Sequence, residues 1–280
     1  MISQRHQISF SERGFYVSRL YCIPKLNEIE KFVDFSKKYN AGFEYNDFFI
    51  PSVLDDEAKI ERIIGEYMKL DRDRSADTLH GVFLDICINS DDSLIYKASD
   101  YRVHQSMDIA TRLGVRAVIF HTNNITNFRL KSYQDGWVSR NEKYWRQLLA
   151  EYPDLCVYVE NMFDDNAELL QRLAESMADE PRFGVCFDLA HAFIGTEPLA
   201  EWCHDLKPYV KHMHINDNDE IEDTHHPVGS MQLPWIIYKE FIDSIPEDKL
   251  PSVLIEVRSY DDLMASVAYM EKNGLYPFWV

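Results

Sequence analysis

Short runs of apolar residues alternate with longer segments of helical periodicity along most of the chain. We expect strands at Gly42–Tyr45, Thr78–Asp85, Ala117–His121, Cys156–Glu160, Phe183–Asp188, Val210–Ile215 and Val253–Val257, with an earlier, poorly defined strand within Gln7–Cys22. We expect helices at Leu26–Lys38, Glu57–Leu70, Ser93–Leu113, Asn141–Tyr152, Asn166–Ala178, Glu197–Leu206, Pro234–Ile245 and Asp261–Asn273. The pattern predicts eight repeats of a strand followed by a helix.

The predicted strands are apolar on both faces, as in Val157-Tyr158-Val159 and Leu254-Ile255. Such strands are typical of a parallel sheet that helices cover. Eight units in 280 residues, without a break in composition, predict a single (β/α)₈ TIM-barrel domain over residues 1–280. A doubly wound open sheet is the alternative, but it would favour a GxGxxG motif after an early strand, and the sequence has none.

Residue types that bind metal ions recur where the predicted strands end. These residues are His80, His121, Glu160, Asp188, His214 and Glu256, followed in nearby loops by His191, Asp223 and His225. A single histidine or acid at a strand end is more often structural, so the prediction depends on the recurrence. Because all strands of a (β/α)₈ barrel point the same way, these side chains are expected to meet at one mouth.

Four of these residues, Glu160, Asp188, Asp223 and Glu256, would repel one another strongly as unpaired carboxylates. Neither Lys nor Arg recurs at the strand ends to neutralise them. Carboxylates together with neutral imidazoles are suitable ligands for Zn²⁺, Mn²⁺ or Fe²⁺. The sequence therefore predicts a divalent-metal site. His212 shares a strand face with His214 and is expected to lie in a lower, structural layer.

Charge and cysteine content narrow the classes of partner. The net charge of −18, from 47 acidic and 29 basic residues, disfavours duplex DNA, whose phosphates attract basic surfaces. Five cysteines without a CxxC pair favour a reducing compartment, so we expect a cytoplasmic protein. The first residues do not resemble a signal peptide, and no stretch approaches about 18 apolar residues, so we expect no membrane partner.

Seven segments together resemble a known superfamily: LHGVFLDI, VIFHTN, VYVEN, VCFDLAHAF, HMHINDND, DTHHPVG and VLIEV. They are similar, over roughly residues 40–260, to the xylose isomerase-like TIM barrels, which include endonuclease IV and many sugar isomerases and epimerases. The resemblance implies one to three metal ions per chain. In order along the chain, the nine candidate ligands match the ligand types of the trinuclear endonuclease IV site.

The first functional hypothesis is a sugar or sugar phosphate isomerase or epimerase. The resemblance implies that Glu160, Asp188, His214 and Glu256 hold one ion, Zn²⁺ or Mn²⁺, which polarises a bound carbonyl. Either glutamate could then remove or return the proton on the neighbouring carbon, and His191 would orient the substrate. Further contacts to a small sugar substrate are expected from Glu44, Phe83, Asn161, Asp217 and Arg258.

Two alternatives remain open at this stage. All nine ligands could hold several ions for phosphoester hydrolysis, as in endonuclease IV, although the loop NDFFIPSVLDD carries no Arg to enter a DNA groove. The chain could also be a binding protein, or a barrel that has lost its chemistry but retains metal. The number of bound ions would separate these hypotheses. The oligomeric state is open, and a homo-oligomer is compatible with the resemblance.

Overall fold

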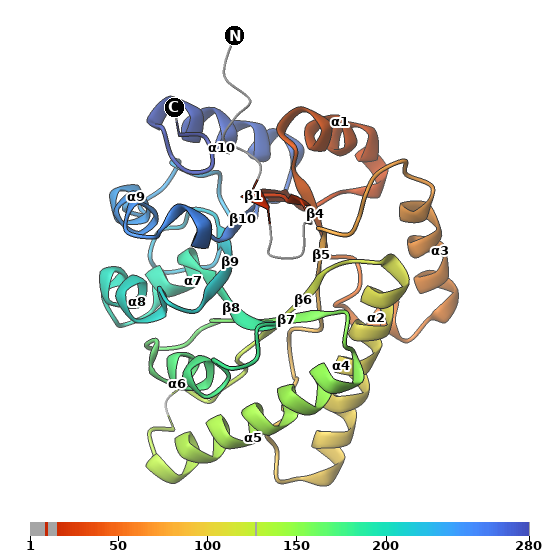
Figure 1. Cartoon of the computed structure of the whole chain (residues 1–280), viewed down its shortest axis with the longest axis vertical. Helices are drawn as coiled ribbons and strands as arrows, with labels where there is room; N and C mark the ends of the chain where they lie inside the picture. The colour runs from red at the N-terminus through yellow and green to blue at the C-terminus, as the bar shows by residue number, and fades with distance from the viewer. Residues whose placement is uncertain (1–8, 11–15, 127, 280) are drawn as a thin grey trace.

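Eight parallel strands close into a barrel in the computed structural model, which describes residues 9–10, 16–126 and 128–279 (Figure 1). The strand order around the barrel is β10-β3-β4-β5-β6-β7-β8-β9. The strands are β3 (Leu20–Cys22), β4 (Gly42–Tyr45), β5 (Thr78–His80), β6 (Ala117–His121), β7 (Cys156–Glu160), β8 (Phe183–Asp188), β9 (Val210–Ile215) and β10 (Ser252–Ile255). A separate antiparallel pair joins β1 (Ser9–Phe10) to β2 (Tyr16–Val17).

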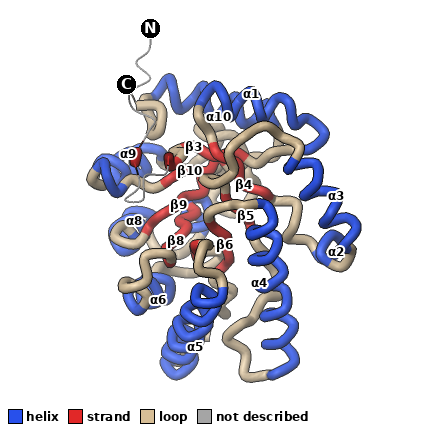
Figure 2. Tube along the Cα trace, turned by 45° about the vertical axis from the view of Figure 1, so that its right-hand side comes forward, coloured by secondary structure: helices blue, strands red, loops and turns tan. Residues whose placement is uncertain are grey.

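Helices form a ring outside the strands, as Figures 1 and 2 show. They are α1 (Ile29–Tyr39), α2 (Pro51–Leu54), α3 (Glu57–Met68), α4 (Ser93–Leu113), α5 (Lys131–Glu151), α6 (Glu168–Ser176), α7 (Leu189–Ile194), α8 (Leu199–Leu206), α9 (Trp235–Asp243) and α10 (Tyr260–Asn273). Short 3₁₀ turns lie at η2 (Leu26–Glu28) and η3 (Glu247–Lys249). This confirms the predicted (β/α)₈ barrel architecture.

Local signals explain where several helices begin and end. The carboxylates of Asp56 and Asp92 accept hydrogen bonds from the first turns of α3 and α4, which leaves fewer backbone N–H groups unsatisfied. At the other end, Gly114 and Gly274 follow α4 and α10 with φ of 71° and 58°. Glycine adopts this left-handed conformation without a Cβ penalty, so it ends a helix cleanly.

The hydrophobic core lies mainly between the barrel and its ring of helices. Trp145 of α5, which is 2% exposed, stacks on Phe120 of β6 with ring centroids 5.3 Å apart. Trp202 of α8 stacks in the same way on Phe187 of β8. These outward-facing strand residues anchor the helices, whereas the inward-facing residues of the same strands are free to build a polar site.

The structure corrects several predicted boundaries. The strand expected at Thr78–Asp85 ends at His80, and the strand expected at Val253–Val257 spans Ser252–Ile255. Helix α5 begins at Lys131, ten residues before the predicted start, because its first half is largely polar and carries Gly136, which weakens the apolar periodicity. The early strand is Leu20–Cys22, and residues 7–8 and 11–15 of that predicted range lie outside the described residues.

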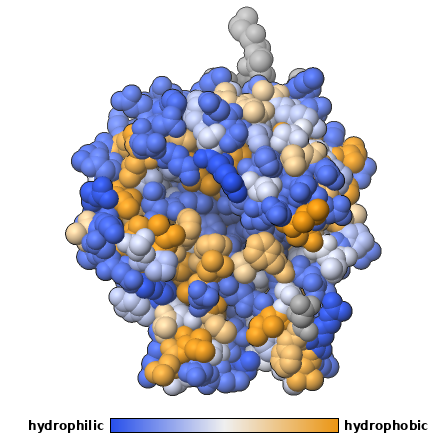
Figure 3. Space-filling view, turned by 180° about the vertical axis from the view of Figure 1, so that it is seen from behind, coloured by the Kyte–Doolittle hydropathy of each residue, from blue (hydrophilic) through white to orange (hydrophobic). Residues whose placement is uncertain are grey.

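The two ends of the barrel differ in character. The elements follow one another clockwise in Figure 1, so right-handed connections place the amino-terminal strand ends toward the viewer. Figure 3, seen from behind, therefore shows the carboxyl-terminal mouth, where a hollow lined by hydrophilic residues opens at the centre. Among the described residues, no helix combines the length and apolar composition needed to cross a membrane. The five cysteines are free thiols.

Candidate metal centre

Four predicted ligands from four consecutive strands converge at the carboxyl-terminal mouth. Glu160 and Asp188 are the last residues of β7 and β8, His214 is the next-to-last residue of β9, and Glu256 directly follows β10. Each offers a ligand atom within 4.8 Å of the others. His214 Nδ1 is 3.2 Å from Glu160 Oε1 and 3.2 Å from Glu256 Oε2. The parallel strands thus gather residues separated by almost a hundred positions.

A second group of ligand atoms adjoins the first through Glu160. His121 Nε2 lies 3.2 Å and His80 Nε2 lies 3.6 Å from Glu160 Oε2. The other carboxylate oxygen of Glu160 faces His214, so one side chain belongs to both groups. A carboxylate with its two oxygens directed toward different ligand sets is suited to bridge two metal ions.

The three remaining candidates form the rim of the site. Asp223 Oδ2 is 3.3 Å from His191 Nε2 and 3.0 Å from His225 Nε2. His191 Nδ1 lies 2.9 Å from the carbonyl oxygen of Asn161, which fixes the ring with its Nε2 toward Asp223. His225 Nδ1 lies 3.2 Å from the carbonyl oxygen of Glu256. All nine predicted ligands therefore occupy one continuous site.

The site contains buried polar atoms that have no hydrogen-bond partner within the described part of the chain. They are Glu160 Oε2, Asp188 Oδ2, Glu256 Oε2, Asp223 Oδ1, His214 Nδ1 and both ring nitrogens of His121. Buried polar atoms are normally paired, so several unpaired ones at one point require an explanation. Each of these carboxylates, and one nitrogen of each imidazole, can ligate a divalent cation, and the residues therefore fit a metal ion.

The carboxylates of the site give it an excess of negative charge, which shifts the pKa values of its side chains. Burial raises the pKa of Asp188, and the nearby carboxylates of Glu160 and Glu256 raise it further. Burial acts in the same direction on Glu160, but His214 and His121 outweigh it and hold the pKa of Glu160 well below its usual range. Protons on imidazoles would thus balance the carboxylates, a balance that a divalent cation can take over.

Glu44, which was predicted to contact substrate, lies beneath the ligands and not at the mouth. Its side chain is fully buried, with Oε1 3.1 Å from His214 Nε2 and Oε2 accepting a 2.7 Å hydrogen bond from Thr78 Oγ1. His212, expected in a lower layer, lies there with Nε2 3.3 Å from Glu44 Oε2. Glu44 therefore orients His214 so that its Nδ1 faces the other ligands.

Two further predicted substrate contacts, Asn161 and Asp217, also lie in the protein interior. Asn161 is fully buried and exchanges hydrogen bonds of 2.8 and 2.9 Å with the backbone of Asp188. Asp217 is fully buried too, and its carboxylate accepts hydrogen bonds from four backbone N–H groups of the following loop and from Trp235 Nε1. Each residue has used its polar atoms to hold the backbone around the site, so neither is free for a substrate.

Phenylalanine side chains line part of the mouth, and one of them, Phe83, is a predicted substrate contact. Phe83 is partly exposed and lies edge-on to His121 at 5.2 Å and to Phe49 at 5.4 Å. Phe49 and Phe163 were not among the predicted site residues. Phe163 lies 5.3 Å from the His191 ring and is 51% exposed. Their position shortly after strand ends was the available signal. Arg258 lies exposed on the surface.

The sequence profile of the xylose isomerase-like TIM barrel family matches residues 40–269. The chain belongs to this family. A curated relative, fructoselysine 3-epimerase of Escherichia coli O157:H7, is 24% identical over 115 residues, which cover 35% of this chain and 41% of the relative. The matched stretch thus spans about two fifths of the relative's length.

Solved structures share the whole barrel at low sequence identity, which shows the fold alone. The TTHB071 protein of Thermus thermophilus, soaked with ZnCl₂, has a TM-score of 0.68 and 20% identity over 91% of this chain and 97% of its own. A D-tagatose 3-epimerase-like protein has a TM-score of 0.67 and 17% identity over 90% of this chain and 96% of its own. Sugar epimerases are therefore among the structural neighbours of this family member.

Proposed function

We propose that this chain is a divalent-metal-dependent epimerase or isomerase of a small sugar or sugar phosphate. The observation that carries the proposal is the four-ligand group of Glu160, Asp188, His214 and Glu256 at the carboxyl-terminal mouth. The relative named a fructoselysine 3-epimerase and the D-tagatose 3-epimerase-like structure support the substrate class. Zn²⁺ and Mn²⁺ are the ions that the mixed oxygen and nitrogen ligands favour.

In the proposed reaction, protein side chains transfer the proton and limit the access of water. When bound, a divalent ion supplies Lewis acidity toward a substrate carbonyl. Glu160 Oε1 and Glu256 Oε2 each lie 3.2 Å from His214 Nδ1, so both carboxylates border the same point of the site. One glutamate can accept a proton from the carbon beside that carbonyl and the other can return it. The partly exposed Phe83 and Phe163 restrict water at the mouth.

Replacement of Glu256 with Gln tests this proposal directly. We expect the wild-type protein to exchange the proton next to the carbonyl of at least one ketose with solvent deuterium, and Glu256→Gln to lose this exchange by at least about 10³-fold, because a neutral amide cannot accept the proton. NMR of a ketose panel measures the exchange. Glu222→Gln, an exposed acid in the neighbouring loop, is the matched control. Unchanged exchange in folded Glu256→Gln would remove this residue from the mechanism.

A second candidate is a multinuclear phosphoester hydrolase, and one observation favours it. His80 and His121 form a second ligand group with Glu160, which a single-ion epimerase would not need. Close to three ions per purified chain, with hydrolysis of a phosphoester, would support the hydrolase. About one ion would support the epimerase, and no bound metal would favour a non-catalytic binding barrel. The net charge of −18 argues for a small phosphorylated substrate instead of duplex DNA in the hydrolase case.

A further inference from the structure

A second cavity lies at the opposite, amino-terminal end of the barrel. Its volume is about 480 Å³, within the range of small-molecule sites. Segments that precede the strands surround it, and four basic side chains line it: Arg116, Lys207, Lys211 and Lys249. Asp248 is the single acidic side chain among the described residues of the lining. In a chain with a net charge of −18, a basic cavity is unexpected from composition.

Lys211 reaches this cavity through an irregularity of the sheet. Val185 of β8 pairs with Val210 and Cys186 pairs with His212, so Lys211 is an extra residue in β9. Such a bulge turns a side chain away from its regular direction. Regular alternation would point Lys211 outward with Met213, toward the helices, yet it lines the cavity at the barrel end.

The absence of a side chain at Gly184 leaves room for the side chain of Lys211. A Cβ built on Gly184 would lie 2.3 Å from Lys211 Cγ and 3.3 Å from the Tyr158 ring. Glycine within a strand often marks such a close approach of another group. The aliphatic part of Lys211 therefore crosses Gly184, and two local features, the bulge and the glycine, direct its ammonium group toward the cavity.

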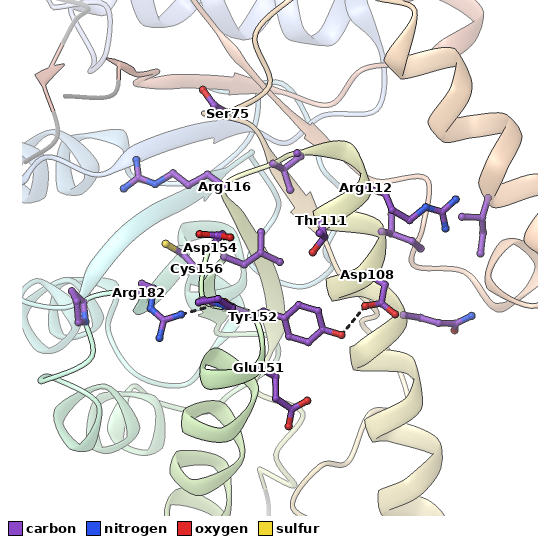
Figure 4. A pocket seen from close by; sticks show the side chains of 18 of the residues that line it. Ser75, Asp108, Thr111, Arg112, Arg116, Glu151, Tyr152, Asp154, Cys156 and Arg182 are labelled. Carbon is purple, nitrogen blue, oxygen red and sulfur yellow. Dashed lines mark hydrogen bonds between the residues drawn. The ribbon is translucent and has the colours of Figure 1, made fainter. Parts of the chain in front are cut away.

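The four basic groups lack counter-ions, unlike their neighbours. None of them has a carboxylate oxygen within 4.0 Å among the described residues. In the adjoining larger cavity, Arg112 pairs with Glu57 and Glu61, and Arg182 pairs with Glu180. Figure 4 shows the side chain of Arg116 extending away from Arg112 and from the hydrogen-bonded Tyr152. Arg116 lines both cavities, whereas Lys207, Lys211 and Lys249 line only the smaller one. Basic groups without an ion pair are therefore concentrated in the smaller cavity.

We infer that the amino-terminal cavity binds a small phosphate-bearing anion, at a site separate from the metal centre. A phosphate offers several oxygens to converging donors, and Arg and Lys bind it through charge-assisted hydrogen bonds. Ser252, which also lines the cavity, places its Oγ 2.7 Å from His212 Nδ1 and adds a hydroxyl group beside the basic residues. The inference does not depend on the reaction proposed for the other mouth.

Titration of the purified, metal-loaded protein with inorganic phosphate at constant ionic strength tests this inference. Isothermal calorimetry is expected to show saturable binding of one phosphate per chain. Lys211→Met keeps the stem over Gly184 but removes the charge, so we expect about tenfold weaker binding. Lys97→Met, an exposed lysine near the start of α4, makes the same change in net charge and should bind like the wild type.

Two more variants separate the possible outcomes. Gly184→Ala leaves every charge in place but displaces the Lys211 stem, so weaker phosphate binding is expected. Glu256→Gln alters the metal centre and should leave phosphate affinity unchanged. The inference is overturned by the absence of saturable binding, by equal affinity in Lys211→Met and Lys97→Met, or by loss of binding in Glu256→Gln. If Gly184→Ala does not fold, the comparison of the two lysine variants decides the question.

Discussion

Two buried carboxylate clusters in this barrel are built on different principles. Asp77, just before β5, is fully buried, and its oxygens accept hydrogen bonds from Phe43 N at 2.8 Å, from Tyr45 Oη at 2.9 Å and from both terminal nitrogens of Arg72. Arg72 also lies over the Phe43 ring at 3.8 Å. This cluster contains its own cation, and both oxygens of the carboxylate are satisfied.

The cluster at the carboxyl-terminal mouth has the opposite design. Asp188 Oδ2 and Glu256 Oε2 are buried without a hydrogen-bond partner among the described residues, and the nearest basic groups are imidazoles. A buried charge is stable only if it is paired. Arg72 neutralises Asp77, whereas no guanidinium among the described residues contacts the carboxylates at the mouth. This difference is expected if a metal ion neutralises the carboxylates at the mouth.

The largest expected effect is the loss of turnover and of bound metal when Asp188 is replaced with Asn. Asp188→Asn keeps the oxygen that accepts the 2.7 Å hydrogen bond from His191 N but removes an anionic ligand. We expect turnover to fall by about 10³-fold or more and metal content to fall, because Lewis acid stabilisation amounts to several kcal/mol. The metal-free protein should unfold at nearly the same denaturant concentration as metal-free wild type. Asp56→Asn, at the N-cap of α3, is the matched control.

The next effect should appear in stability alone. Asp77→Ala leaves the guanidinium of Arg72, whose side chain is 10% exposed, without its partner. Loss of one member of a buried ion pair costs about 3–5 kcal/mol of unfolding free energy. Urea unfolding measures this, and metal content should stay unchanged. Asp243→Ala, which breaks an exposed pair with Lys239, should cost less than about 1 kcal/mol. If Asp77→Ala instead lost bound metal while its unfolding free energy stayed unchanged, the distinction between the two clusters would be contradicted.

A smaller effect is expected at the residue beneath the metal centre. Glu44 Oε1 lies 3.1 Å from His214 Nε2, and this charged contact favours the ring orientation in which Nδ1 faces the other ligands. Glu44→Gln should lower metal affinity by about 10–100-fold, with the barrel intact. Competition with a chromophoric chelator measures the affinity, and Glu66→Gln on the exposed face of α3 serves as control. Unchanged affinity would reduce Glu44 to a packing residue.

The fold and the ligands could be predicted because both depend on local pattern plus one rule of topology. The apolar runs located seven strands, and parallel strands must bring their carboxyl ends to one mouth, so His80 and Glu256 were placed together although 176 positions separate them. The roles of Glu44, Asn161 and Asp217 could not be predicted in this way. The sequence shows a polar residue near a strand end, but not whether a backbone N–H group or a substrate is its partner.

Asp164 is another buried carboxylate, and among the described residues it has hydrogen-bond donors but no ion-pair partner. Its oxygens accept from Thr122 Oγ1 at 2.7 Å and from Met162 N at 3.0 Å, and burial raises its pKa to about 6. An acid whose pKa is raised on folding holds its proton more tightly in the folded state, so its contribution to stability is greatest below pH 4 and decreases as the pH rises toward 6.

This contribution gives the smallest predicted effect. Between pH 4 and pH 6 the wild-type protein should lose about 2 kcal/mol of unfolding free energy relative to Asp164→Asn, which carries no charge at this position. Urea unfolding of both proteins across this range measures the difference, and Asp179→Asn on the exposed surface should follow the wild type. Parallel pH profiles for wild type and Asp164→Asn would show that Asp164 ionises freely. In that case neutral donors alone would suffice to hold a buried carboxylate, and the unpaired oxygens at the mouth would be weaker support for a metal ion.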